Sequence, residues 1–228
     1  MSSKVDRAAH GPSWGEVILG AILSLLLGVV LGAALLIFKP VVMAKEMPPA
    51  KDRQPGAVYY VEGLRGDASR AKQALAKRKA LMEGQSIKVT EDEVNSLVSA
   101  SAAPTVAAKP GEAPAAPASE TVSTGTPNVR IREGVMQVGV PVTLNVLGLE
   151  QKLIAQARGA FEKDGDRFVY VPREMYLGSC PVHRLPFLAG YVRGKLLSSE
   201  QVPDDIAAAW SRFTTVAIEG NALVLAAQ

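Results

Sequence analysis

Residues 17–38 read VILGAILSLLLGVVLGAALLIF, a run of 22 positions without a charged side chain. A helix of this length, at about 1.5 Å per residue, is roughly 33 Å long and can cross the hydrocarbon core of a bilayer. Trp14 precedes the run and Lys39 follows it, and both residue types are common at membrane interfaces. The sequence therefore predicts one transmembrane helix over residues 17–38, preceded by a short N-terminal tail of residues 1–16.

A cleaved signal peptide is the competing interpretation of this run. The apolar core of a signal peptide spans about 7–15 residues and ends near small residues at the cleavage site. Residues 42–44 (VMA) resemble such a site, but the apolar run is too long for a signal peptide. We therefore expect an uncleaved anchor and a single-pass membrane protein.

The charges beside the run give conflicting indications of its orientation. The tail is formally neutral, whereas four cations follow the run: Lys39, Lys45, Lys51 and Arg53. The positive-inside rule would place these cations in the cytoplasm, but the rule weakens when a long domain follows the anchor. A short tail, an early anchor and a long C-terminal domain are typical of exported proteins. We expect a protein of the cell (inner) membrane whose C-terminal domain is extracytoplasmic.

Small residues recur at every fourth position of the run, at Gly20, Ser24, Gly28 and Gly32. They share one helix face, where small side chains let two helices pack closely, as in dimers of the Gly-x-x-x-Gly type. A homodimer through this face is therefore one hypothesis. The alternative is that small residues are simply frequent in membrane helices.

The chain after the anchor divides into a stalk and a globular domain. Residues 39–56 contain four prolines, which interrupt helices, and predict a Pro-rich stalk. Residues 57–100 form the first part of the domain, with a short strand before a helix over residues 67–83. A second helix follows Thr90, which forms a capping box with Glu93.

Positive charge is concentrated in the part of the chain next to the anchor. Residues 39–83 carry 10 basic and 5 acidic side chains, and five of the cations lie on the expected helix, at Arg70, Lys72, Lys77, Arg78 and Lys79. These cations could rest on anionic headgroups, at roughly 1 kcal/mol per cation close to the surface, or could form a solvated helix face. No nucleic acid partner is expected, because aromatic residues are not interleaved with the cations.

Residues 101–127 differ in composition from the rest of the chain. Of these 27 residues, 8 are Ala, 5 are Pro and 7 are Ser or Thr, and none is aromatic. Such a segment cannot bury enough apolar surface to offset the entropy lost on ordering. The sequence predicts a disordered Ala/Pro/Ser/Thr-rich insert between two parts of one domain.

Residues 128–228 predict a β-meander, two helices over residues 186–197 and 203–213, and a terminal hairpin. Apolar side chains alternate with others over residues 136–146, as in a strand with one apolar face. The residues on that face are Met136, Val138, Val140, Val142, Leu144 and Val146. The expected fold class is α+β, in which a curled antiparallel β-meander follows the transmembrane helix and helices pack on one face.

No pattern of catalytic or metal-binding residues is present in the sequence. The chain has one cysteine and two histidines, which excludes an internal disulfide framework and a multi-cysteine metal site. Cys180 and His183 are three residues apart, but Pro181 lies between them and a third partner is absent, so Cys180 is interpreted as a bystander. We therefore expect no enzyme, no cofactor and no metal centre.

Short motifs follow the anchor in a characteristic order. Residues 90–95 (TEDEVN) begin a helix, residues 177–178 (LG) lead into residues 185–186 (LP), and residues 216–225 (VAIEGNALVL) form the last hairpin. In this order they resemble the YpmS-like family of bacterial single-pass membrane-anchored proteins of unknown function. The resemblance covers most of residues 57–228.

The resemblance implies an elongated, curled-sheet lipid-binding fold, in which a helix lies in a groove lined by apolar strands. If this fold carries over, the apolar face from Met136 to Val146 contacts an acyl chain or a covering helix. The first functional hypothesis is therefore a membrane-anchored, non-enzymatic domain that binds or shields a lipid or another apolar molecule of the bacterial envelope.

The second hypothesis is a scaffold or partner-binding subunit of a membrane complex, without a ligand. Its partner would be an unknown membrane protein or a second copy of the chain, joined through the helix face of small residues. A closed, dry core would favour this hypothesis, whereas a long open apolar groove would favour lipid binding. The sequence pattern of the strands is the same in both cases.

Overall fold

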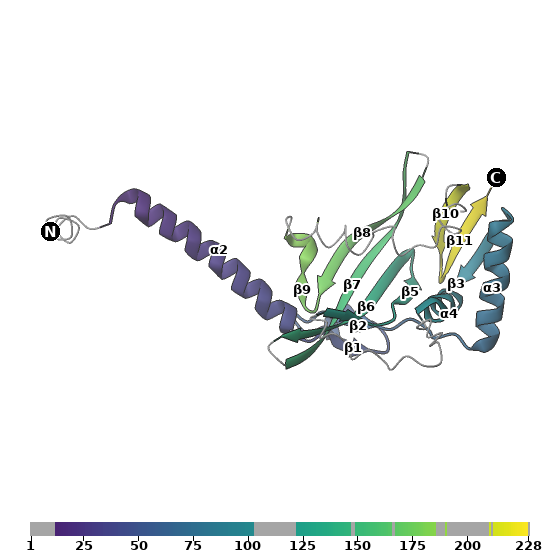
Figure 1. The fold of residues 1–228 in the computed structure, drawn as a ribbon, viewed down its shortest axis with the longest axis horizontal. Coiled ribbons are helices and arrows are strands. Elements are labelled where there is room, and N and C mark those ends of the chain that lie inside the picture. Colours follow the sequence, from purple (N-terminus) through teal and green to yellow (C-terminus); the bar gives the residue numbers. More distant parts are fainter. Residues whose placement is uncertain are drawn as a thin grey trace, which may run out of the picture.

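The computed structural model describes residues 12–102, 122–146, 149–165, 167–185, 190, 210 and 212–227. The fold is α+β, as the sequence predicts: a long apolar helix, α2 (Trp14–Phe38), projects from a domain of mainly antiparallel sheets with helices packed against them (Figure 1). The first part of the chain, up to residue 11, and most of the insert, residues 103–121, lie outside the described residues.

Helix α2 begins three residues before the uncharged run because Ser13 and Glu16 form a capping box. The Glu16 backbone N–H donates to Ser13 Oγ at 3.3 Å, and the Ser13 backbone N–H donates to Glu16 Oε2 at 3.0 Å. Among the described residues, α2 is the helix that is long and apolar enough to span a membrane, and none of its residues is buried.

The segment expected to be a stalk folds in part against the domain. Strand β1 (Val42–Ala44) pairs in parallel with β2 (Tyr59–Val61), and a short 3-10 helix, η1 (Ala50–Asp52), lies between them. The prolines exclude a long helix here, but the apolar residues of β1 still find a strand partner, so the segment returns to the domain.

The meander forms a six-stranded sheet with the order β4-β6-β7-β8-β9, and β5 also pairs with β6. Its strands are β4 (Val122–Thr124), β5 (Asn128–Arg132), β6 (Val135–Val146), β7 (Leu149–Asp164), β8 (Arg167–Leu177) and β9 (Cys180–Pro181). Glu133 and Gly134 both have positive φ, 52° and 76°, as a tight turn between β5 and β6 requires. Strand β4 lies in the segment expected to be disordered, where Val122, Ser123 and Thr124 pair with β6.

A second sheet of three strands has the order β10-β11-β3. It combines the expected terminal hairpin, β10 (Phe213–Glu219) and β11 (Ala222–Ala227), with β3 (Ile87–Thr90) from the other side of the insert. Helices α3 (Ala68–Met82) and α4 (Glu91–Ala102) pack beside it. The main core lies between this sheet, the helices and the large sheet, and its buried residues are Leu81, Val129, Ile131, Phe213, Val216, Leu223 and Leu225.

A short 3-10 helix, η2 (Val182–Arg184), follows β9. The two helices expected over residues 186–197 and 203–213 lie outside the described residues, except for Gly190, Trp210, Arg212 and Phe213. Phe213 begins β10, so this residue belongs to a strand rather than to the second of these helices.

Candidate functional site

The apolar face of β6 is divided between core and a more open part. Met136 and Val138 pack against the main core. Val140, Val142 and Leu144 are half-buried further along the strand, and the side chain of Val146 lies outside the described part of the structure. Their partners across β7 include Leu153, Ala155 and Ala157, which are buried.

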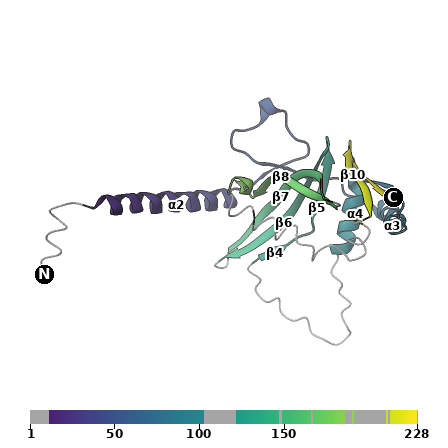
Figure 2. The same ribbon diagram turned by 90° about the horizontal axis from the view of Figure 1, so that it is seen from above.

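The last turn of α2 is attached directly to the large sheet. The Ser179 backbone N–H donates to the Leu36 carbonyl oxygen at 3.0 Å, and the Ser179 hydroxyl donates to the Pro40 carbonyl oxygen at 3.2 Å. Gly178, at φ 56°, lies so close to the Ile37 carbonyl oxygen that a Cβ atom would collide with it. Helix and domain therefore form one unit (Figure 2).

A cavity of about 220 Å³ lies between α2 and the segment that follows β8. Four α2 residues at helical spacing line one side, and four residues of β9, η2 and its C-terminal neighbour line the other: Val29, Gly32, Ala33, Leu36, Cys180, Pro181, Arg184 and Leu185. Apart from Arg184, these side chains are apolar. Gly32 of the expected dimer face therefore faces this cavity, whereas Gly20, Ser24 and Gly28 are exposed on the helix.

Cys180 and His183 do not form a catalytic pair. Cys180 is buried, and burial raises the pKa of its thiol, which disfavours the reactive thiolate. His183 Nδ1 lies 3.2 Å from the Met175 backbone nitrogen and 3.0 Å from the Met175 carbonyl oxygen, so the imidazole contacts the backbone of β8. Val182 beside it joins Ala157 and Met175 in a second buried apolar cluster.

The basic residues expected at the membrane surface lie on α3, at the end of the domain remote from α2 (Figures 1 and 2). Two of them contact acidic residues of α4: Arg70 Nε lies 2.9 Å from Asp92 Oδ2, and Lys77 Nζ lies 2.7 Å from Glu93 Oε2. Lys79 lies 4.0 Å from Glu83, the residue that follows α3, Lys72 is exposed, and Arg78 is half-buried. This position separates the cations from the apolar helix α2.

The TEDEVN motif (residues 90–95) connects the start of α4 to β5 and to the segment around Leu64 through side-chain hydrogen bonds. Glu91 accepts backbone hydrogen bonds from Leu64 at 2.6 Å and Ile131 at 2.8 Å. Asn95 donates to the Leu64 and Val129 carbonyl oxygens at 2.9 and 2.7 Å and accepts from the Val129 backbone N–H at 2.7 Å. Half of the expected capping box is present: the Thr90 backbone N–H donates to Glu93 Oε2 at 2.8 Å, while the Thr90 hydroxyl donates to Asp92 Oδ1.

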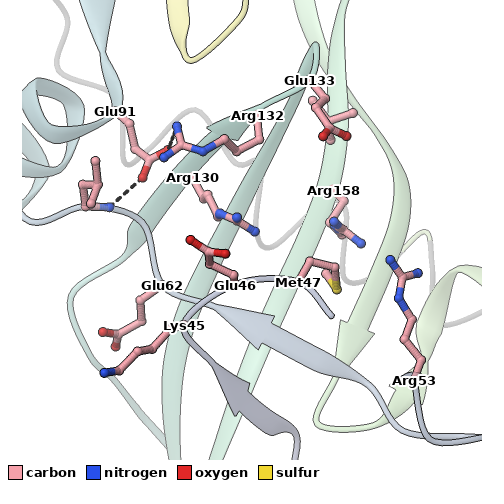
Figure 3. A pocket seen from close by; sticks show the side chains of 12 residues that line it. Lys45, Glu46, Met47, Arg53, Glu62, Glu91, Arg130, Arg132, Glu133 and Arg158 are labelled. Carbon is pink, nitrogen blue, oxygen red and sulfur yellow. Dashed lines mark hydrogen bonds and ion pairs between the residues drawn. The ribbon is translucent and has the colours of Figure 1, made fainter. Parts of the chain in front are cut away.

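A polar cleft of about 500 Å³ lies on the other face of the large sheet, beside the chain that carries β1 and β2 (Figure 3). Its lining residues are Lys45, Glu46, Met47, Arg53, Glu62, Leu64, Glu91, Arg130, Arg132, Glu133, Val135 and Arg158. The sequence carries no local signal for this site, because Arg53 follows η1, Arg130 and Arg132 lie on β5 and Arg158 lies on β7, and only the fold brings them together.

The fold and these sites define a class of protein: an α+β domain built directly onto one long apolar helix. Among the described residues, no group of three or more His, Cys, Asp or Glu side chains could hold a metal ion. No protein-family model matches the chain, and no curated protein and no solved structure is significantly similar to it.

Proposed function

We propose that this protein is a membrane-anchored, non-enzymatic domain that binds or shields a lipid or another apolar molecule of the bacterial envelope. In this proposal α2 is a single-pass anchor in the cell membrane, the domain is extracytoplasmic, and the chain belongs with the YpmS-like proteins that its motifs resemble. The observation that carries the proposal is the apolar cavity between α2 and the sheet, beside the apolar face of the strands.

The position of the cavity along α2 supports a lipid as the ligand. The helix has 25 residues. At about 1.5 Å per residue it is about 37 Å long, compared with about 30 Å for the hydrocarbon core of a bilayer. If the excess of about 7 Å emerges at this end, then Gly32 and Ala33 lie at the edge of the core and Val29 lies at acyl-chain depth, so in this proposal the cavity is at the membrane boundary.

The end of the large sheet near α2 also suits contact with lipid. Leu149 is 74% exposed and Val122 is 52% exposed, and both lie at the ends of strands beside the open part of the β6 face. Exposed apolar side chains are costly in water but not in a membrane interface. In this proposal, Leu149 and Val122 form an apolar path between the membrane and Val140, Val142 and Leu144.

The experiment is to purify the full chain in detergent, extract it with organic solvent and quantify lipid by mass spectrometry. G32L/A33L fills the cavity, and G20L/A21L makes the same two substitutions on an exposed turn of the same helix. We expect the wild type and G20L/A21L to retain stoichiometric lipid and G32L/A33L to lose it. A lipid-free extract from the folded wild type, or equal retention by both variants, would contradict the proposal.

A scaffold or partner-binding role is the second candidate. It is favoured because Met136 and Val138 pack against the main core, so this part of the strand face has no space for a ligand. Its interface would include the exposed small residues Gly20, Ser24 and Gly28. Crosslinking the intact chain in membranes distinguishes the candidates, because a scaffold gives a defined protein adduct and no stoichiometric lipid.

A further inference from the structure

The polar cleft contains a row of charged and polar side chains that the strand register creates. Arg130 on β5 pairs with Gln137 on β6, Gln137 pairs with Arg158 on β7, and Arg158 pairs with Glu174 on β8. Directly paired residues point to the same face of a sheet, and two strand spacings separate Arg130 from Arg158 by about 10 Å. Two long guanidinium side chains can therefore reach one small group placed between them.

The central residue of the row, Gln137, is covered by β2, so the side chains of the row line a cleft rather than an open surface. Gln137 is buried, and its Nε2 donates to the Val61 carbonyl oxygen of β2 at 3.5 Å. Figure 3 shows Arg130, Arg158 and Arg53 projecting into the space beside this cover, with Glu46 close to Arg130. Arg53 is held by its own backbone contact, since its Nε donates to the Pro48 carbonyl oxygen at 2.8 Å.

Several charged side chains of the cleft have partners among the described residues, whereas Arg130 does not. Glu91 is fully engaged by two backbone N–H groups and by Arg132 at 3.2 Å, and Glu62 pairs with Arg65 at 3.6 Å. Arg158 lies 3.8 Å from Glu174. Arg130 is half-buried and makes no hydrogen bond or ion pair within the described part of the chain.

The environment of Arg130 is unfavourable for its charge in the absence of an anion. Burial lowers the pKa of Arg130, and the positive charges of Arg132 and Arg158 lower it further, while Glu91 and Glu46 act in the opposite direction. A guanidinium that is half-buried between two others is stabilised by an oxyanion, which it binds through two parallel N–H groups.

We infer that this cleft binds a phosphate group, with Arg130 and Arg158 as its principal ligands and Arg53 at the entrance. The cleft volume of about 500 Å³ accommodates a phosphorylated small molecule or a lipid headgroup. Both sources present the same chemistry to the arginines. The negative charge of Glu46 near Arg130 opposes the binding of an anion.

The test uses the full chain in dodecyl maltoside, a detergent without phosphate, and isothermal titration calorimetry. The probes are inorganic phosphate, glycerol 1-phosphate and dihexanoyl phosphatidylglycerol. Saturable binding of at least one probe is expected. Phosphatidylglycerol that binds about tenfold more tightly than glycerol 1-phosphate identifies a lipid headgroup, and equal affinities identify a soluble phosphate compound.

Three variants connect the binding to the cleft. R130Q/R158Q should weaken phosphate binding about tenfold or more, because it removes both guanidinium groups that would bind the oxyanion. K72Q/K79Q removes the same net charge from the exposed face of α3 and should leave binding unchanged. E46Q should tighten binding, and it also provides a test if R130Q/R158Q fails to fold. Absence of saturable binding, an equal loss in both double variants, or weaker binding by E46Q would overturn the inference.

Discussion

At the scale of single residues, Asn95 shows how a buried polar side chain fixes the domain. Its amide bridges the Leu64 and Val129 backbones, which belong to different parts of the chain. The TEDEVN motif was predicted from its sequence as a helix start, and this prediction holds. Its second role, joining α4 to β5, depends on tertiary contacts that no local pattern encodes.

We predict that N95L destabilises the chain by about 2–4 kcal/mol, because each unsatisfied buried polar group costs about 1–3 kcal/mol. The matched control is S99L, which makes a similar substitution at an exposed position of the same helix. Urea unfolding of the detergent-solubilised chain measures both. Equal midpoints for the two variants would show that Asn95 does not hold β5.

The acidic residues beside Asn95 predict a loss of stability in acid. Burial raises the pKa of Glu93, but hydrogen bonds from Lys77 and the Thr90 backbone outweigh this effect, so its pKa lies below the ordinary value. The Thr90 hydroxyl lowers the pKa of Asp92, burial opposes this, and the charge of Arg70 lowers it further. Groups whose folded pKa is lowered stabilise the chain above their unfolded pKa of about 4 and lose this effect as pH falls.

We therefore expect the melting temperature to fall as the pH decreases from about 5 to 3, through and below the unfolded pKa values. E93Q should melt lower than the wild type at neutral pH and show a flatter pH profile. E83Q, at an exposed glutamate at the end of α3, is the control. Parallel profiles for E93Q and the wild type would contradict the role of Glu93.

At the scale of elements, the junction between α2 and the turn before β9 attaches the apolar helix to the domain. Turns with a clear local signal, such as Glu133-Gly134 and Asp164-Gly165, were predictable because positive φ selects glycine. The junction was not, since Gly178 contacts a helix more than a hundred residues earlier in the chain. The pairing of β3 with β11 and the row from Arg130 to Glu174 could not be predicted for the same reason, because they too depend on contacts between distant parts of the chain.

We predict that G178A weakens this junction by about 1–3 kcal/mol beyond the effect of positive φ alone. G220A is the matched control, because Gly220 has φ 62° but a Cβ atom added there would have no heavy atom within 4 Å. Unfolding free energies of the two variants, with limited proteolysis near Pro40, measure the difference. If the two substitutions cost the same, then Gly178 does not secure α2.

At the scale of the whole molecule, the position of α3 changes the expected relation between charge and membrane. Sequence proximity placed the basic residues next to the anchor, but the fold carries α3 to the far end of the domain (Figure 1). The apolar cavity and the end of the β6 face lie nearest to α2 instead. In this account, the domain meets lipid through apolar side chains, and the cleft that contains Arg53, Arg130, Arg132 and Arg158 lies on the other face of the large sheet.

The most direct test of lipid binding is photo-crosslinking in native membranes from the open part of the β6 face. A benzophenone amino acid replaces Val140, which is half-buried on the apolar face, or Lys152, which is exposed on the opposite face of the same sheet. The account predicts a lipid adduct at position 140 and none at position 152. A protein adduct at 140 without lipid, or equal lipid adducts at both positions, would contradict it.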